Sequence, residues 1–453
     1  MHYSFSLIAP YMKKILSKND NIAVTGIARG GKTVFLTSLL AQLEEFDQAD
    51  FSFAGNSKIE AFKELRTRSD FIRQFPLDRY RDFLAMRGSW PEKTSDAYCY
   101  SCEYWRSDWK FWKQRLNFFD FPGERIADSA IAAVPDYRKW SEHILSHLKN
   151  HKSLFEDARG YFEILENPSA PLEEIIFEYK LTLARLILNF KPLITPSTFL
   201  LSKEGITAKK GSVNELASQR ASGLDFDSEF VPLSREYCEQ NPEYAERMHK
   251  NFRLYRRNVV MPLYRELGKC RKLIVLIDLP TLLAGGVGQY NDNRQILQDL
   301  FQTLRPDSSI GRKLASTIKF WQRPLEKVAF AASKADMIYN DDIENGTAEG
   351  LLRQLTSKAR KIVPEAEYRW FVCSACQSSV KGEKPYTLRG RPARNNPEKQ
   401  IVEFEVPRLP ENWPDSWQPG DYRFKALLPE VPKNTQKPPR HINLDAVFDF
   451  IAN

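Results

Sequence analysis

The sequence is poor in cysteine and lacks any long apolar run. Its 453 residues include only six cysteines, which are scattered at positions 99, 102, 238, 270, 373 and 376. A secreted domain stabilised by disulfides is shorter and denser in cysteine, so this composition favours a reducing compartment. Nowhere do roughly 18 uncharged apolar residues follow one another, which excludes an ordinary transmembrane helix.

The N-terminal segment does not read as a secretory signal, and neither sign of charge is in strong excess. In the N-terminal segment the charges follow a brief apolar stretch, and no small-residue cleavage pattern is present. The formal net charge of +8 arises from 66 basic and 58 acidic residues. That excess is too small for this length to indicate nucleic acid binding. We therefore expect a cytoplasmic protein that is at most peripheral to the inner membrane.

Short apolar runs with the length of a strand recur at wide intervals. Each ends at a polar residue or a glycine and is followed by a helical pattern. The runs cover residues 22–25, 116–119, 273–277, 327–332 and 369–373. This alternation predicts an α/β fold with a mostly parallel sheet and helices on both faces. Ligands of such sheets bind at the carboxyl ends of the strands, where these polar residues fall.

Two long stretches interrupt the alternation. The first carries a helical pattern over 57–74 that stops near Pro76. The second is dominated by helical patterns, with one apolar face over 172–190. A further helix is expected over 244–267, with a kink at Pro262. We interpret the second stretch as a helical insertion of domain size.

These patterns divide the chain into three predicted parts. Residues 1–124 and 270–380 form the domain that contains the parallel sheet, and 125–269 form the helical insertion. Residues 381–453 form a C-terminal extension that is rich in proline and charge. Most of this extension is expected to be irregular until a short apolar helix over 442–451 docks on the rest.

The most specific motif is GIARGGKT at residues 26–33, which fits the pattern G-x-x-x-x-G-K-[ST]. Glycines let backbone N–H groups wrap around phosphate oxygens, and the helix that opens at Lys32 adds the positive end of its dipole. A glycine turn that binds nothing is the alternative, which the preceding strand and the following helix disfavour. Lys32 is expected to act on the β- and γ-phosphates and Thr33 to bind Mg²⁺. The predicted nucleotide contacts are Gly26, Ala28, Arg29, Gly30, Gly31, Lys32, Thr33 and Val34.

Two further segments are expected near the γ-phosphate and the metal ion. Asp120 begins an Asp-x-x-Gly motif after an apolar strand, where its carboxylate can hold Mg²⁺ through water. Gly123 of the same motif can donate its N–H to the γ-phosphate. Thr94 precedes an apparent strand over 97–103 and can complete the Mg²⁺ shell. The alternative for Thr94 is an ordinary loop threonine.

A third and a fourth motif indicate which base is bound. Ser333-Lys334-Ala335-Asp336 is like the [NT]-K-x-D motif of GTPases, with serine in the first place. Asp336 can accept hydrogen bonds from the guanine N1–H and 2-amino groups, which adenine cannot donate, and Lys334 can lie across the ring plane. The alternative is that Ser333 and Asp336 cap a helix. The pair Ser374-Ala375 ends the next strand, and its backbone can contact the guanine oxygen.

These four motifs in this order, the loop WPEKT at 90–94 and the helical insertion resemble the YcjX-like family of P-loop NTPases. The segments GRP at 390–392 and HINLD at 441–445 are also similar. The resemblance spans most of the chain. It implies a Ras-like nucleotide domain with an inserted helical domain, GTP or GDP as the ligand, and a bacterial stress-associated role. The effector protein is not disclosed by these residues.

The resemblance also bears on hydrolysis. Ras-like proteins often have a glutamine after Asp-x-x-Gly to orient the attacking water, and this chain has Glu124. Its carboxylate is repelled by the γ-phosphate, so slow GTP turnover is expected unless a partner or a rearrangement assists. Arg29 or Arg125 can supply positive charge to the transition state, although such arginines more often pair with neighbouring acids on the surface. Two alternatives stay open at this point. The chain can hold GTP or GDP as a structural element without useful hydrolysis, or it can be an ATPase or phosphotransferase.

Three other features suggest weaker alternatives. His143, His147 and His151 share one helix face, but a zinc site needs ligands that the sequence does not bring there. Cys373 and Cys376 form a single C-x-x-C pair, for which a core role is favoured. A basic loop can contact membrane headgroups, although a solvated loop is commoner. Its basic residues are Lys381, Lys384, Arg389, Arg391, Arg394 and Lys399.

Overall fold

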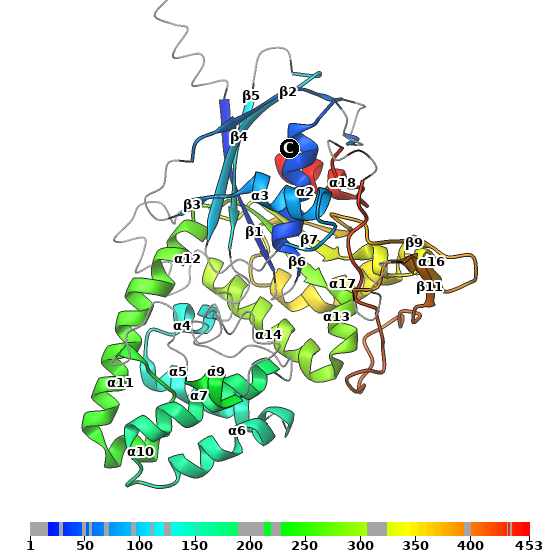
Figure 1. The fold of residues 1–453 in the computed structure, drawn as a ribbon. Helices are drawn as coiled ribbons and strands as arrows, with labels where there is room; N and C mark the ends of the chain where they lie inside the picture. Colours follow the sequence, from blue (N-terminus) through cyan, green and yellow to red (C-terminus); the bar gives the residue numbers. More distant parts are fainter. Residues whose placement is uncertain are drawn as a thin grey trace, which may run out of the picture.

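The computed structural model contains a sheet of eight described strands that is flanked by helices (Figure 1). The structure describes residues 17–26, 30–47, 51–53, 57–67, 72–91, 97–109, 113–121, 128–150, 152–188, 213–218, 228–305, 324–393, 400–432, 434 and 437–453. The strands of the large sheet are β1 (Ser17–Gly26), β2 (Ile59–Leu65), β3 (Arg73–Gln74), β4 (Tyr98–Arg106), β5 (Lys113–Asp120), β6 (Lys272–Asp278), β7 (Lys327–Ser333) and β8 (Glu367–Val372).

The sheet is mostly parallel, with β1 at its centre. The strand order is β2-β4-β5-β1-β6-β7-β8, and β3 pairs with β4. The strands β5, β1, β6, β7 and β8 are parallel, whereas β4 is antiparallel to both β5 and β2. Because β5 and β6 flank β1 on opposite sides, the strand order reverses beside β1, where such sheets bind ligands. The predicted α/β fold is confirmed.

The prediction of a helix over 57–74 is wrong. This segment contributes β2, which pairs antiparallel with β4, and β3, which pairs parallel with it. The spacing of Ile59 and Phe62 is compatible with a helix, but backbone bonding to β4 decides the conformation, because an edge strand with exposed polar side chains shows no clear period of two. Pro76 precedes α3 (Leu77–Ala85) and therefore marks the start of a helix.

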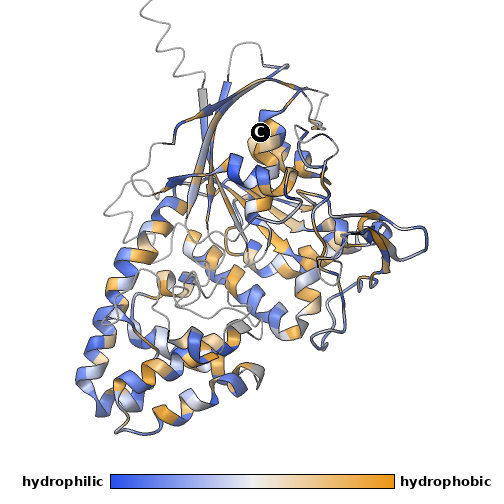
Figure 2. Ribbon diagram, viewed as in Figure 1, coloured by the Kyte–Doolittle hydropathy of each residue, from blue (hydrophilic) through white to orange (hydrophobic). Residues whose placement is uncertain are grey.

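Alternating side chains of the central strands supply two hydrophobic layers. In β1, Ile22 and Val24 face one layer and Ala23 faces the other, as the period of a strand requires. The first layer includes side chains of α2 (Lys32–Glu44), α3 and α18 (Leu444–Ala452). The second includes side chains of α13 (Leu279–Ala284), α14 (Gly286–Leu304) and α17 (Thr347–Arg360). In Figure 2 the helices carry apolar and hydrophilic residues in alternation along their length.

Helices occupy most of the described chain between β5 and β6, and they lie beyond the end of the sheet at which β1 and β5 terminate (Figure 1). Their buried residues Trp140, Tyr161 and Phe252 belong to the same hydrophobic cluster as Val275 of β6. The helical region and the sheet thus share one core. The helices are α4 (Ser129–Ala133), α5 (Tyr137–Asn150), α6 (Lys152–Leu165), α7 (Leu172–Leu188), α9 (Val213–Ala217), α10 (Arg235–Gln240), α11 (Pro242–Tyr255) and α12 (Met261–Leu267).

The irregularity expected near Pro262 takes the form of a π-helical turn, η5 (Arg256–Val260), between α11 and α12. Pro262 lies in the first turn of α12. Since proline has no N–H and its ring collides with the preceding turn, the hydrogen-bond register changes just before it.

The C-terminal extension is partly irregular, as predicted, but two of its segments form a small antiparallel sheet with a strand that begins just before it. This sheet consists of β9 (Ser379–Lys381), β10 (Thr387–Gly390) and β11 (Val402–Glu405). The short elements before it are η6 (Ala335–Met337) and α16 (Asn340–Glu344). The predicted terminal helix is present as α18 and packs on the large sheet. In the described part of the chain, no helix has both the length and the apolar character needed to cross a bilayer.

A buried ion pair anchors the end of α18 to the sheet. The ammonium of Lys272 lies 2.9 Å from the carboxylate of Asp20, and both side chains are nearly inaccessible. The same ammonium donates to the carbonyl oxygen of Ala452, as does the side-chain amide of Gln114. The C-terminal helix is therefore bound to the amino ends of β1, β5 and β6.

Candidate functional site

Two glycines shape the loop between β1 and α2. Gly26 ends β1 with φ 154°, and a Cβ atom there would lie 2.4 Å from the carbonyl oxygen of Leu276 in β6. Gly31 precedes α2 with φ 79°, and a Cβ atom there would meet nothing within 4 Å. Gly26 thus allows close packing of the two strands, and Gly31 allows the left-handed turn into the helix.

The first turn of α2 presents backbone N–H groups and a lysine. Gly31 has no side chain to cap this end of the helix, and the first turn contains no acidic residue. The N–H groups of a first helical turn have no partner within the helix, so they can bind an anion. The Lys32 side chain is 7% exposed, and its ammonium lies 3.4 Å from the carbonyl oxygen of Gly26. Lys32 therefore folds over the mouth of the loop.

Asp120 lies at the same edge of the sheet. It is the last residue of β5 and stands opposite Val24 of the parallel strand β1. Its side chain is fully buried, and the next backbone N–H, that of Phe121, donates to the Val24 carbonyl oxygen at 3.2 Å. Thr33 stands in the first turn of α2, so a hydroxyl and a carboxylate follow the ends of adjacent strands. Oxygen atoms of these kinds are suitable ligands of Mg²⁺.

Several predicted residues lie outside the described part of the chain. They are Ala28, Arg29, Thr94, Gly123 and Glu124, as well as Arg125 and His151. Their roles at the phosphates and the metal ion stay predictions.

On the far side of β6, Lys334 is held in an uncommon conformation by an acidic partner. Its φ is 61°, in the left-handed region that a residue with a side chain rarely adopts. Its ammonium lies 2.5 Å from the carboxylate of Asp278 at the end of β6. Asp278 also accepts hydrogen bonds from the backbone and the hydroxyl of Thr281. No role was predicted for Asp278, although a polar residue at the end of an apolar strand is a recognisable signal in the sequence.

The carboxylate of Asp336 is buried and accepts hydrogen bonds from two serines. The Ser374 hydroxyl donates to Oδ1 at 2.6 Å. Ser378 donates twice to Oδ2, from its backbone N–H at 2.7 Å and from its hydroxyl at 2.6 Å. The structure thus joins the third and fourth predicted motifs directly. The alternative that Asp336 is a helix cap is wrong, because no side-chain cap is present at η6.

The Ser374–Ala375 loop is fixed by the C-terminal segment. Ser374 and Ile442 exchange two backbone hydrogen bonds, at 2.9 and 2.7 Å. Ala375 is half-buried beside the layer of α2 and α18. The HINLD segment therefore supports the loop that was predicted to contact the base.

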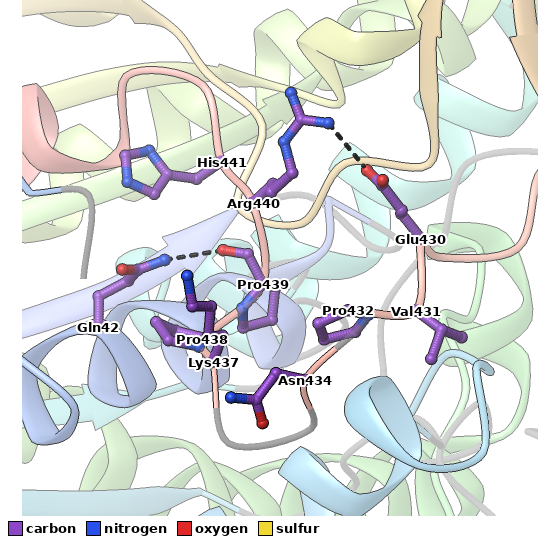
Figure 3. A pocket seen from close by; sticks show the side chains of 10 residues that line it. All are labelled: Gln42, Glu430, Val431, Pro432, Asn434, Lys437, Pro438, Pro439, Arg440 and His441. Atoms are coloured by element: carbon purple, nitrogen blue, oxygen red, sulfur yellow. Dashed lines mark hydrogen bonds and ion pairs between the residues drawn. The ribbon is translucent and has the colours of Figure 1, made fainter. Parts of the chain in front are cut away.

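A separate cavity of about 450 Å³ lies beside the last turns of α2 (Figure 3). The Gln42 amide donates to the Pro439 carbonyl oxygen across its wall, and Arg440 pairs with Glu430 at 3.6 Å. Gln42 is ten residues beyond Lys32, or about 15 Å along the helix. None of the residues predicted to bind nucleotide lines this cavity. Its lining residues are Gln42, Glu430, Val431, Pro432, Asn434, Lys437, Pro438, Pro439, Arg440 and His441.

His147, Cys373 and Cys376 lie in partly or fully buried surroundings. His147 of α5 lies 3.3 Å from the carboxylate of Asp292 in α14. Burial raises the pKa of Asp292 to about 7. Within the described ranges, no set of three His, Cys, Asp or Glu side chains forms a metal site. Burial raises the pKa of Cys373 to about 12 and raises that of Cys376 further. Thiols with such pKa values are poor nucleophiles at neutral pH.

The basic loop is partly paired with acidic residues of the chain. Lys381 lies 3.9 Å from Asp341, and Arg389 lies 3.6 Å from Glu383. Arg391 donates to the carbonyl oxygen of Pro429. The described part of the loop is therefore less available to an external anion than its sequence suggests.

Comparison with known proteins gives two matches that cover nearly all of the chain. The sequence model of the YcjX-like family, DUF463, matches residues 21–195 and 227–453. The Ras-like GTPase YcjX of Escherichia coli (strain K12) is 24% identical over an alignment of 465 positions, which covers 96% of each chain. The matched residues include the loop before α2, Asp120, Asp336 and Ser374. The mixed α/β architecture is that of a Ras-like P-loop protein.

Proposed function

This chain belongs to the YcjX-like family, and from that premise we propose that it binds GTP and GDP with Mg²⁺ and hydrolyses GTP slowly as a nucleotide-dependent switch. The observation that carries the proposal is the position of two chemically different groups of residues at one edge of the sheet. The loop before α2 suits phosphates, and Asp336 with Ser374 suits a base that donates hydrogen bonds. A related protein is named a Ras-like GTPase, which agrees with this proposal.

The phosphate end of the proposed site has three components. Backbone N–H groups of the loop and of the first turn of α2 hold the phosphate oxygens, and the ammonium of Lys32 neutralises their charge. Thr33 and Asp120 would hold Mg²⁺. When bound, the metal ion neutralises charge that develops on the phosphates. Thr94 and the Gly123 N–H respond to the γ-phosphate in this proposal.

Hydrolysis is proposed to be slow because of Glu124. A carboxylate repels the γ-phosphate, so it orients water poorly compared with a neutral amide. Arg29 or Arg125 supplies positive charge when a partner or a rearrangement completes the site. The proposed partners are a guanine nucleotide and an effector protein. A stress-related role in the cytoplasm belongs to the same proposal.

A titration of the purified chain with fluorescent GDP, GTP and ATP, with and without Mg²⁺, tests the proposal. Because adenine cannot make the two hydrogen bonds to a buried carboxylate, adenine nucleotides should bind roughly 100-fold or more weakly than guanine nucleotides. Equal affinity for ATP and GTP would support the alternative of an ATPase or phosphotransferase. Tight GTP binding with no phosphate release over hours would support a structural nucleotide instead.

A hydrogen bond between Asp128 and Tyr255 links the proposed switch to the helical region. Asp128, eight residues after Asp120, accepts a hydrogen bond from the Tyr255 hydroxyl at 2.7 Å, and both side chains are buried. The next residue, Arg256, donates to the carbonyl oxygens of Ile131 and Ala132 in α4. These contacts bind the start of α4 to η5, where π-helical turns often mark functional sites.

Tyr255→Phe is therefore expected to uncouple α11 from the bound nucleotide. In the unmodified chain, amides of α11 should differ in opening free energy between the GDP and GTP-analogue states by about 1 kcal/mol or more. Hydrogen exchange should show this difference shrinking in the variant, with GDP affinity unchanged. Tyr237→Phe is the matched control, because its buried hydroxyl donates to Ala170 within the helical region. An equal loss in both variants would contradict the proposed route.

A further inference from the structure

The hydrogen bonds on Asp336 create a conflict with the base that it is proposed to bind. A carboxylate has about four acceptor positions, two on each oxygen. Here Oδ1 accepts one bond, from Ser374, and Oδ2 accepts two, both from Ser378. One position on Oδ1 is therefore left, whereas Oδ2 is filled.

Guanine presents two donors in a fork, the N1–H and the 2-amino group, and a fork is best received by both oxygens of a carboxylate. Rotation of the Ser374 hydroxyl toward the Cys376 carbonyl oxygen, 3.2 Å away, would free only Oδ1. A position on Oδ2 opens only if Ser378 gives up one of its two bonds. Its hydroxyl can leave by rotation about one side-chain bond, whereas its N–H belongs to the backbone.

We propose that Ser378 is a positioning residue that limits the preference of this site for guanine over bases that present a single donor. In the nucleotide-free protein its hydroxyl occupies the position on Oδ2 that the guanine fork requires, and it turns away when the base binds. Its N–H stays on Oδ2 and keeps the carboxylate aimed at the base. This inference rests on the proposed function, because it names the residue that tunes the same site.

The small sheet of the C-terminal extension holds Ser378 in place. Ser378 directly precedes β9, and the hydroxyl of Ser379 donates to the backbone carbonyl oxygen of Asp336. A Cβ atom on Gly390 of β10 would lie 2.7 Å from the Ser378 carbonyl oxygen, so β10 packs closely against this backbone. The extension thus contributes directly to the proposed base site.

The test compares GDP with inosine diphosphate, which lacks the 2-amino group and so has one donor at this edge. A single donor can use the remaining position on Oδ1, whereas the fork must displace the Ser378 hydroxyl. In Ser378→Ala the displacement is no longer needed. Calorimetric titration should then show the ratio of the two dissociation constants, inosine diphosphate over GDP, rising about tenfold.

Two further variants separate this role from a merely structural one. Ser379→Ala removes a nearby buried hydroxyl that does not contact the carboxylate, and its ratio should equal that of the unmodified chain. Ser378→Thr retains the hydroxyl and should keep the original ratio, with thermal unfolding measured for all variants. An unchanged or lower ratio in Ser378→Ala would overturn the assignment of Ser378. If the unmodified chain fails to prefer GDP over ADP, the proposed function itself fails.

Discussion

Lys32→Ala should weaken the binding of both GDP and GTP on the order of 10²- to 10³-fold, because it leaves the phosphates without their buried counter-charge. The Lys32 side chain is 7% exposed and already lies over the loop, near the carbonyl oxygen of Gly26. Little reorganisation is needed for its ammonium to contact a phosphate between that carbonyl and the first turn of α2. Equilibrium titration with fluorescent GDP measures the loss.

Lys113→Ala is the matched control for this experiment. It removes the same charge from the chain, but Lys113 begins β5 at the amino end of the strand and pairs with Glu103 at 2.6 Å. Its GDP affinity should stay within about twofold of the original, as expected for a partly exposed pair. If Lys32→Ala binds GDP as tightly as Lys113→Ala does, the loop before α2 is not the phosphate site.

Asp336→Asn should convert a preference for guanine into a preference for xanthine. Asparagine offers one acceptor and one donor where aspartate offers only acceptors. Xanthine carries an oxygen in place of the 2-amino group, so its N1–H and that oxygen complement an amide. The variant should lose GDP affinity by roughly 10²- to 10⁴-fold, as two charge-assisted hydrogen bonds are lost, and should gain affinity for xanthosine diphosphate.

An inversion of the nucleotide preference distinguishes a change in base recognition from misfolding of the variant. A variant that is merely misfolded would lose affinity for both nucleotides, whereas a change in base recognition strengthens one of them. Asp341→Asn makes the same chemical change at an exposed position nearby and should bind GDP normally. Should Asp336→Asn retain the original order of nucleotides, Asp336 does not contact the base, and an adenine-binding or structural role becomes the better explanation.

The strands and the glycines beside the predicted phosphate loop were predictable because their signals are local. An apolar run followed by a polar residue identifies a buried strand and its carboxyl end without any distant information. The segment GIARGGKT combines glycines and a lysine at fixed spacing, so the positions of its glycines and its charge follow from adjacent residues. Gly26 and Gly31 have positive φ values, as the motif requires.

The edge strand β2 was not predictable in the same way. Ile59 is buried, but three of the seven residues of β2 are charged and exposed, and the buried and exposed positions follow no simple order. A helix and a strand fit such a segment almost equally well. Pairing with β4 decides between them, and that pairing joins residues about 40 positions apart in the sequence.

Local spacing in the sequence predicts which residues can carry phosphate and base chemistry, and it places them after strands of a parallel sheet. Which groups surround these residues depends on contacts between distant parts of the chain. Asp336 meets Ser378 from 42 residues away, and Lys334 meets Asp278 from 56 residues away. These contacts depend on the order of strands in the sheet and on the path of the C-terminal extension. Such distant pairings are set by how whole elements pack, which no local spacing of residues encodes.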